Sequence, residues 1–269
     1  MTEVTRRFVQ TSAGTIHCAI AGDHRGTDVV LLHQTPRSWN EYRDVLPLLG
    51  RRRRTIAIDT VGFGDSSALP WGSDSIERWA EVALEVLDEL KIERAHLVGH
   101  HTGAAVATEM ATTASDRARS IVLSSAPFDD AETRAAHLEG PAVADDVSPQ
   151  PDGSHVLELW RTRAGFDPEG RIDLLQAYLI DALKAGPRAA EGHQVVARYD
   201  MQAAVTRLRC PVLLVGATDD PYAYPALEPM RAALPEAQVE VIQGGMVPLP
   251  DQLPEQFAAV VERFLDQID

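Results

Sequence analysis

Three side chains in this sequence have the types and spacing that acid–base catalysis requires. His101 lies at the centre of the segment HLVGHHTGAAVA (96–107), and the neighbouring carboxylates Asp219 and Asp220 follow an apolar run much later in the chain. An imidazole changes its charge near neutral pH, and a carboxylate bonded to one ring nitrogen fixes the tautomer of the ring. The pattern indicates a histidine that acts as a general acid or base with the support of an aspartate.

The segment around His101 has the pattern of a strand, a tight turn and a helix. An apolar run ends at Gly99, Gly103 follows the turn, and small residues continue at helical spacing. Glycine at these two places allows a sharp turn and close packing of the strand against the helix. The apex of such a turn needs a strained backbone with positive φ, which histidine tolerates better than most residues. We expect His101 to occupy this apex.

Apolar runs and amphipathic segments alternate along the chain. Two short runs around a Ser-Ala-Gly turn predict an antiparallel hairpin near the N-terminus. Helical patterns occupy residues 40–50, 74–92 and 254–268. Continuous apolar runs, typical of strands buried on both faces, occupy residues 28–34, 54–60, 95–100, 120–125, 210–220 and 238–245. The alternation predicts an α/β protein with a mostly parallel, eight-stranded sheet flanked by helices.

Residues 128–205 interrupt this alternation. Their first part is polar, acidic and rich in proline and glycine, and RIDLLQAYLIDALKA (171–185) has a helical pattern. A segment of this length is too long for a plain loop. We therefore expect a core formed by residues 1–127 and 206–269, and a helical cap formed by residues 128–205.

Four motifs follow predicted strands in a fixed order: LLHQTPRSW (31–39), DTVGFGDSS (59–67), LVGHHTG (97–103) and LVGATDDP (214–221). Together with the last helix they resemble the α/β-hydrolase superfamily, in particular its small capped esterases, epoxide hydrolases and C–C hydrolases. The resemblance covers the chain outside the expected cap. It implies the α/β-hydrolase fold with a helical cap insertion.

The catalytic residues that the family implies are only partly present. The family has a serine at the apex of the turn, an acid after the seventh strand and a histidine after the eighth. Here His101 holds the serine position, Met246 stands where the histidine is expected, and Asp219 supplies the acid. The chain contains no Gly-x-Ser-x-Gly segment, and its last histidine is His193. A complete Ser-His-Asp triad is therefore absent from the sequence.

The remaining groups favour a dyad in which His101 is the general acid or base. Asp219 is the expected partner of the ring, with Asp220 as the alternative. Such a dyad suits lyase, isomerase or cyclase chemistry on a small organic carbonyl compound, and equally the activation of water for hydrolysis of an ester, lactone or epoxide. The other hypothesis is a non-catalytic, receptor-like protein that binds a small molecule, similar to the plant gibberellin receptors.

The resemblance also implies an oxyanion hole made by the backbone N–H groups of Thr102 and Thr35. Thr35 belongs to the turn HQTP, in which Gln34 replaces the family glycine. Its amide is expected either to enter the pocket as a further donor or to be buried as a structural group. His33 is assigned to the same turn, and Trp160 of the expected cap is assigned to the wall of the substrate pocket.

Composition limits the partners of the protein. The formal net charge is −15, from 40 acidic and 25 basic side chains, which disfavours nucleic acid and anionic membranes. No apolar run has membrane-spanning length. Cys18 and Cys210 form neither a disulfide framework nor a metal-binding spacing, and no cofactor fingerprint is present. We expect a cytoplasmic monomer or homodimer that acts on a small-molecule substrate with no metal and no cofactor.

Overall fold

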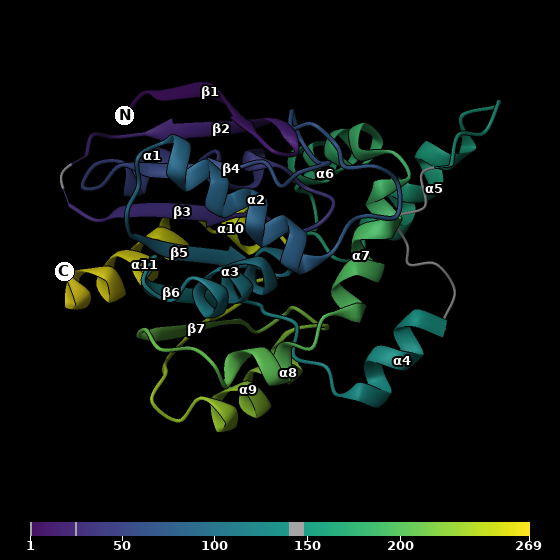
Figure 1. Cartoon of the computed structure of the whole chain (residues 1–269). Helices are drawn as coiled ribbons and strands as arrows, with labels where there is room; N and C mark the ends of the chain where they lie inside the picture. The colour runs from purple at the N-terminus through teal and green to yellow at the C-terminus, as the bar shows by residue number, and fades with distance from the viewer. Residues whose placement is uncertain (1, 25, 140–147) are drawn as a thin grey trace.

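The computed structural model describes residues 2–24, 26–139 and 148–269. Residues 140–147, which belong to the expected cap, lie outside this description. Eight strands form one sheet in the order β1-β2-β4-β3-β5-β6-β7-β8, which confirms the predicted fold class (Figure 1). They span Val4–Thr11 (β1), Gly14–Ala21 (β2), Asp28–Leu32 (β3), Thr55–Ile58 (β4), Ala95–His100 (β5), Ala118–Ser124 (β6), Val212–Ala217 (β7) and Gln238–Ile242 (β8).

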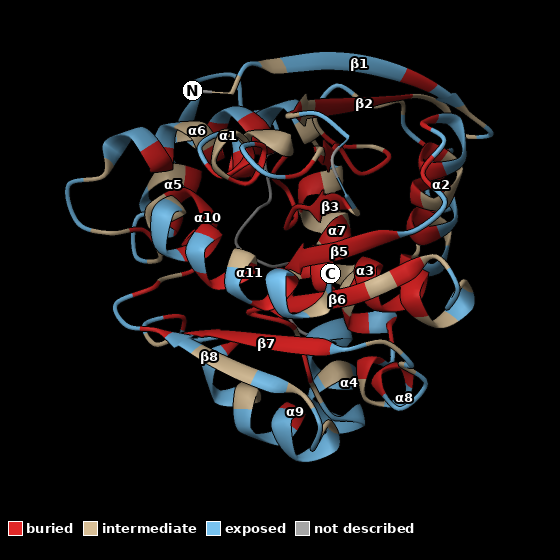
Figure 2. Cartoon of the chain, turned by 90° about the vertical axis from the view of Figure 1, so that its left-hand side faces the viewer, coloured by how far each residue is buried: buried red, intermediate tan, exposed pale blue. Residues whose placement is uncertain are grey.

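Strand pairing follows the sequence pattern. β1 and β2 form the predicted antiparallel hairpin, β2 also pairs antiparallel with β4, and the remaining neighbours are parallel. The parallel strands β3 to β7 are almost entirely buried, as expected for strands covered on both faces, whereas β1 is largely exposed (Figure 2).

Helices cover the two faces of the sheet and use alternate residues of each strand. Val30 and Leu32 of β3 pack in the cluster that contains α2 (Ile76–Glu89) and α3 (Thr102–Thr113). Val29 and Leu31 pack in the cluster on the other face, with α1 (Leu46–Leu49), α10 (Leu249–Gln252) and α11 (Pro254–Ile268). α9 (Leu227–Ala233) joins β7 to β8. Among the helices of the described residues, none combines the length and hydropathy needed to cross a membrane.

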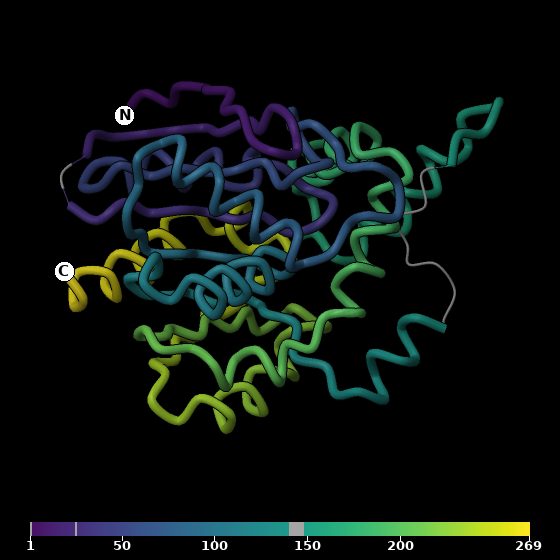
Figure 3. The backbone as a smooth tube through the Cα atoms, in the orientation of Figure 1, coloured from purple at the N-terminus to yellow at the C-terminus, as the bar shows by residue number. Residues whose placement is uncertain are grey.

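The segment between β6 and β7 is helical. It contains α4 (Ala131–Glu139), α5 (Ser154–Arg163), α6 (Ile172–Ala185), α7 (Arg188–Arg198) and α8 (Met201–Val205). The helices α4 to α7 gather at the end of the sheet where the parallel strands terminate, while the end of α11 lies at the opposite end (Figures 1 and 3). A small apolar cluster built on Leu159, Leu175 and Tyr178 holds α5 against α6.

The single helix predicted over residues 40–50 is wrong. A 3-10 helix, Trp39–Tyr42, is followed by turns and then by the short helix α1. Pro47 explains the break, because proline lacks the N–H that a continuous helix would need at this position. In the structure Pro47 lies in the first turn of α1, where a helix tolerates proline.

The turn between β5 and α3 depends on contact between backbones. A Cβ atom at Gly103 would lie 1.9 Å from the carbonyl oxygen of Leu32 in β3, and one at Gly99 would lie 2.2 Å from the carbonyl oxygen of Gly103. Neither obstacle is a movable side chain. The two glycines therefore set how closely α3 can approach the end of the sheet.

We expect Gly103→Ala to lower the free energy of unfolding by about 1–3 kcal/mol, because overpacking forces the backbone apart. Gly165→Ala is the control, since a Cβ there meets nothing within 4 Å, and its effect is expected to stay within about 0.5 kcal/mol. Urea unfolding of both variants measures the difference. Equal stability of the two variants would contradict the close contact.

Candidate active site

His101 lies at the apex of the turn, as the N-cap residue of α3. Its backbone angles are φ 47° and ψ −116°, which confirms the predicted positive φ. For a residue with a Cβ this conformation is strained, and it persists only where the surroundings enforce it. Here the close approach of Gly99 and Gly103 enforces it, and the imidazole is held at the carboxyl end of β5.

The ring of His101 is bonded to Asp220, in the loop after β7. The distance from Nε2 to Oδ2 is 2.7 Å, the carboxylate is fully buried and the imidazole is 18% exposed. Oδ1 of Asp220 accepts the backbone N–H groups of Tyr222 and Ala223, each at 3.0 Å. Burial alone would raise the pKa of this carboxyl, but the neighbouring His101 ring and the N–H donors outweigh burial and hold the pKa well below its ordinary value. Asp220 is therefore an ionised carboxylate at neutral pH.

The expectation that Asp219 is the partner of His101 is corrected. Asp219 is exposed, its Oδ1 accepts the hydroxyl of Thr218 at 2.9 Å, and its backbone N–H donates to the carbonyl of Gly245. That backbone bond ties Asp219 to the loop after β8 and leaves its side chain in solvent. The next residue, Asp220, is the one that enters the interior.

His100 borders the His101 ring and is locked by two hydrogen bonds. The two rings are perpendicular with centroids 4.7 Å apart. Nε2 of His100 lies 2.8 Å from the carbonyl of Val247, and Nδ1 lies 3.0 Å from the hydroxyl of Ser124. Burial, with a contribution from His101, lowers the pKa of His100 to about 3. His100 is therefore a neutral group that donates to Val247 and fixes the neighbouring ring.

The turn after β3 brings Thr35 next to Thr102. The backbone N–H of Thr35 points at the hydroxyl of Thr102, with a long N–O distance of 3.3 Å. Thr102 is the first residue of α3, and the first N–H groups of a helix have no partner within the helix. The backbone N–H groups assigned to an oxyanion hole thus come from two adjacent, buried residues.

Gln34 lines the cavity, and its amide already donates one hydrogen bond within the turn. Its backbone N–H and its Nε2 both bond the carboxyl of Glu41, at 2.9 and 2.5 Å. Burial raises the pKa of Glu41, although Arg37 nearby lowers it. The amide nitrogen of Gln34 therefore stabilises the turn, which is the structural alternative considered from the sequence.

The assignment of His33 to the oxyanion hole or substrate pocket is corrected. His33 is buried, its Nδ1 lies 2.8 Å from the carbonyl of Gln34, and its Nε2 accepts the backbone N–H of Thr60 at 2.9 Å. Burial lowers the pKa of the ring. Both nitrogens are occupied, so His33 joins the turn after β3 to the turn after β4.

A cavity of about 350 Å³ lies over His101, between the core and the inserted helices. Arg163 of α5 lines it; the guanidinium is bonded to Asp167 at 3.0 Å and lies over the ring of Tyr178, 4.0 Å from its centroid. Sequence reasoning missed Arg163, because an arginine on a helix is ordinarily a surface residue. The other lining residues are mixed apolar and polar groups: Gln34, Thr35, Thr102, Pro127, Asp129, His137, Phe166, His193, Gln194, Val196, Ala197, Tyr222 and Val247.

Trp160 does not belong to this lining, which corrects its assignment to the pocket wall. It packs, half-buried, against the apolar cluster between α5 and α6. The large ring therefore stabilises the inserted helices rather than facing the substrate space.

A buried cluster of charges supports the turn that carries Thr35. Arg37 is almost fully buried, with Nε 2.9 Å from Asp181 of α6 and Nη1 2.5 Å from Asp251 of α10. Glu41 lies close enough to affect the same guanidinium. One positive charge thus faces three carboxyl groups. Burial raises the pKa of Asp251 to about 7, although the pairing with Arg37 opposes this shift.

Among the described residues, one further cluster has the composition of a metal site. Ligand atoms of His17, Asp59 and Asp65 lie within 4.8 Å of one another. His17 is already bonded to Asp59 through Nδ1, at 2.8 Å, and accepts from Nε of Arg6 through Nε2, also at 2.8 Å. Asp65 pairs with Arg6 and Lys184. Two side-chain cations therefore hold the places that a metal ion would take.

The sheet order, the turn at His101 and the acid after β7 together define the class of the protein. The model of the Alpha/beta hydrolase family matches residues 29–260, and the chain belongs to this family.

Curated relatives match part of the chain. It is 34% identical over 114 residues to a 2-hydroxy-6-oxo-2,4-heptadienoate hydrolase of Pseudomonas putida. The aligned residues cover 41% of this chain and 41% of that hydrolase. It is also 34% identical over 106 residues to a soluble epoxide hydrolase of a Corynebacterium species, covering 39% of this chain and 36% of that one. These matches span less than half the length of either relative.

Solved structures match over nearly the whole chain. A thermophilic esterase from Thermogutta terrifontis superimposes with a TM-score of 0.79 at 23% identity, covering 98% of this chain and 99% of the esterase. An enol-lactonase from Burkholderia xenovorans gives a TM-score of 0.77 at 18% identity, over 97% and 100% of the two chains. At these identities the likeness establishes the fold.

The Arg37 cluster predicts an unusual pH dependence of stability. The native state holds a proton on Asp251 more tightly than the unfolded chain does, so the stabilisation is present at low pH and is lost as the pH rises through about 7. The difference in unfolding free energy between the wild type and Asp251→Asn is expected to fall by up to about 1.4 kcal/mol per pH unit from pH 5 to 7, and to level off above. Urea unfolding at pH 5, 6, 7 and 8 measures it, and a constant difference contradicts the prediction.

Proposed function

We propose that this protein is an enzyme in which His101 acts as the general acid or base and Asp220 orients it. The observation that carries the proposal is the 2.7 Å contact between Nε2 of His101 and the buried, ionised Asp220. In the neutral imidazole, Nε2 then carries the proton and Nδ1 holds the lone pair. Within the part of the chain that the structure describes, Nδ1 has no hydrogen-bond partner, and His101 lines the cavity.

The chemistry proceeds by proton transfer through Nδ1. The lone pair takes a proton from a carbon next to a carbonyl, or from a water that attacks an ester, lactone or epoxide. The positive charge on the ring is then balanced by Asp220, and the negative charge on the substrate oxygen is met by the N–H groups of Thr35 and Thr102. Return of the proton from Nδ1 completes the cycle, so no oxidant, metal or covalent intermediate is required.

The cavity supports a substrate with an apolar body and an acceptor group. Phe166, Val196 and Val247 supply apolar walls. Nη2 of Arg163 is buried and has no hydrogen-bond partner within the described residues. A buried guanidinium N–H favours a carboxylate or carbonyl oxygen. The relative from Pseudomonas putida is named for a keto-dienoate, which has both groups. These observations support a small carbonyl compound as the substrate.

Screening of aryl esters, lactones, epoxides and β-dicarbonyl compounds, followed by assay of variants, tests the proposal. His101→Ala is expected to lower kcat by about 10²–10⁴ while ligand affinity and fold are retained. Asp220→Asn removes the charge that balances the imidazolium, and we expect a loss in the same direction. His24→Ala, at an exposed histidine before β3 that does not line the cavity, is the control. Turnover that is unchanged in His101→Ala rules out the dyad.

Binding without turnover is the second candidate function, as in a receptor-like protein. The observation that favours it is the buried arginine beside the cavity, which supports binding whether or not reaction follows. The two functions differ in one measurement. A compound that binds to wild type and to His101→Ala with equal affinity, and that is recovered unchanged from the wild type, identifies a binder.

Serine-directed phosphonate probes provide a separate prediction. We expect no covalent labelling of the wild type, and none of His101→Ser, because the position where the family has its histidine is Met246. His100 cannot replace that histidine, since Val247 and Ser124 occupy its ring nitrogens. Intact-protein mass spectrometry detects the adduct. A stoichiometric adduct on the wild type would show that an activated serine exists.

A further inference from the structure

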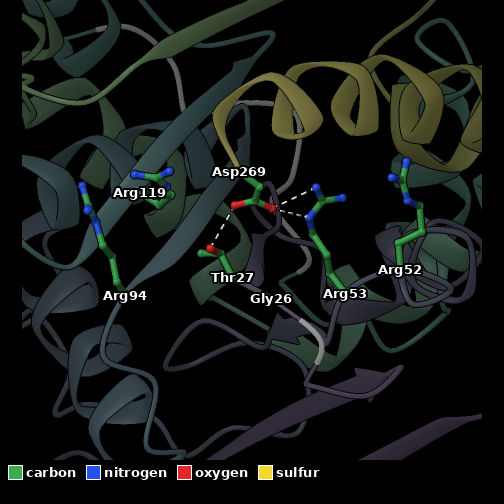
Figure 4. A pocket seen from close by; sticks show the side chains of 7 residues that line it. All are labelled: Gly26, Thr27, Arg52, Arg53, Arg94, Arg119 and Asp269. Atoms are coloured by element: carbon green, nitrogen blue, oxygen red, sulfur yellow. Dashed lines mark hydrogen bonds and ion pairs between the residues drawn. The ribbon is translucent and has the colours of Figure 1, made fainter.

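A second cavity lies at the other end of the sheet, where the parallel strands begin. It has a volume of about 600 Å³ and is lined by Arg52, Arg53, Arg94, Arg119, Gly26, Thr27 and Asp269 (Figure 4). The arginines precede or begin β4, β5 and β6, and Thr27 directly precedes β3. These four strands are neighbours in the sheet. The amino ends of these strands therefore bring four guanidinium groups to one cavity. The positive charge is concentrated there although the formal net charge of the protein is −15.

Two of the arginines are neutralised by carboxylates. Nε of Arg53 lies 3.0 Å from Asp269, its Nη2 lies 2.8 Å from Asp266, and Arg52 pairs with Asp266 as well. Arg53 is buried, so this pair forms a fixed wall of the cavity.

Asp269 lines the cavity, and its carboxylate contacts three side chains. Besides Arg53, it accepts the hydroxyl of Thr27 at 3.0 Å, and it lies 3.1 Å from Nε2 of the buried His96 (Figure 4 shows the bonds to Thr27 and Arg53). Burial lowers the pKa of His96, although Asp269 opposes the shift, so the histidine is neutral and adds no charge. The carboxylate of Asp269 is thus committed to partners other than Arg94 and Arg119.

The other two arginines bond carbonyl oxygens only. Nε and Nη2 of Arg94 share the carbonyl of Ala118, at 3.3 and 3.2 Å, and Nη2 of Arg119 bonds the carbonyl of Ile268 at the end of α11. Within the described residues, the partners of both guanidiniums are backbone carbonyls and not carboxylates. Capping of α11 uses one of the five N–H donors of Arg119 and none of Arg94. Counted over side chains alone, the four lining guanidiniums with the carboxylates of Asp266 and Asp269 leave an excess of two positive charges.

We propose that this cavity binds the phosphoryl group of a small molecule, at a site separate from the cavity over His101. A phosphate dianion matches the excess charge of two. A phosphoryl group offers three acceptor oxygens pointing in different directions, against two in one plane for a carboxylate, so they can be shared between guanidiniums that approach from different strands. The volume exceeds that of inorganic phosphate, so the rest of an ester or a second phosphate has room. This proposal does not depend on the chemistry assigned to His101.

Isothermal titration with inorganic pyrophosphate in 100 mM NaCl at pH 7.5 tests the site. The wild type is expected to bind one pyrophosphate. The double variant Arg94→Gln/Arg119→Gln is expected to bind at least about tenfold more weakly, because charge-assisted hydrogen bonds are lost. The matched control is Arg161→Gln/Arg231→Gln, which removes the same charge from exposed positions outside the cavity and is expected to bind as the wild type does.

Three results overturn the proposal: no binding to the wild type, equal binding to the double variant, or equal weakening in the control, which would indicate a diffuse charge effect. Backbone NMR of the wild type with added pyrophosphate locates the site without any substitution. Pyrophosphate is expected to shift the amide signals of Thr27 and Asp269 and to leave that of His101 unchanged. Shifts confined to residues elsewhere likewise exclude the site. His101→Ala is expected to bind pyrophosphate as the wild type does, which keeps this test independent of the proposed catalysis.

Discussion

The buried carboxylate of Asp220 is the constraint on which the candidate active site depends. An ionised group taken out of water is costly unless it is paired and hydrogen-bonded. Two backbone N–H groups satisfy one of its oxygens, and the imidazole of His101 satisfies the other. The bond to Asp220 places the ring proton of His101 on Nε2 and leaves Nδ1 without a proton, available to the cavity. It also compensates for the strained backbone of His101, since the ring meets the carboxylate from that position.

The same requirement relates the site to the rest of the fold. His101 is placed by β5 and Asp220 by β7, strands that do not pair with each other and are separated by β6. Their side chains meet because parallel strands end at a common edge. The contact of Gly103 with the carbonyl of Leu32 then sets the position of α3, and with it the N–H of Thr102 relative to the turn of Thr35. On the proposed function, base and oxyanion donors are positioned by backbone contacts rather than by flexible side chains.

Periodicity and turn chemistry predicted the sheet, the hairpin and the positive φ of His101, because each of these is determined locally. The sequence could not decide between Asp219 and Asp220, since the outcome depends on a backbone bond to Gly245 in a distant loop. The roles of His33 and Gln34 likewise depend on Thr60 and Glu41, which the fold brings to them. Trp160 and Arg163 were beyond sequence reasoning for a similar reason. Both lie on α5, and only the packing of α5 against α6 determines which of them lines the cavity.

The two ends of the sheet carry charge in different ways. At the carboxyl end the ionisable groups are buried and paired, so their energetics depend on desolvation as much as on attraction. At the amino end Arg53 is buried, but the other three arginines are exposed or partly exposed, and the excess charge is screened by solvent and salt. An anion bound there would contact arginines that also hold the end of α11, which covers one face of the sheet. A ligand that binds only the native state stabilises it by an amount that grows with the logarithm of its concentration relative to Kd. On this proposal, an anion in the arginine cavity therefore stabilises α11 and the strands that α11 covers.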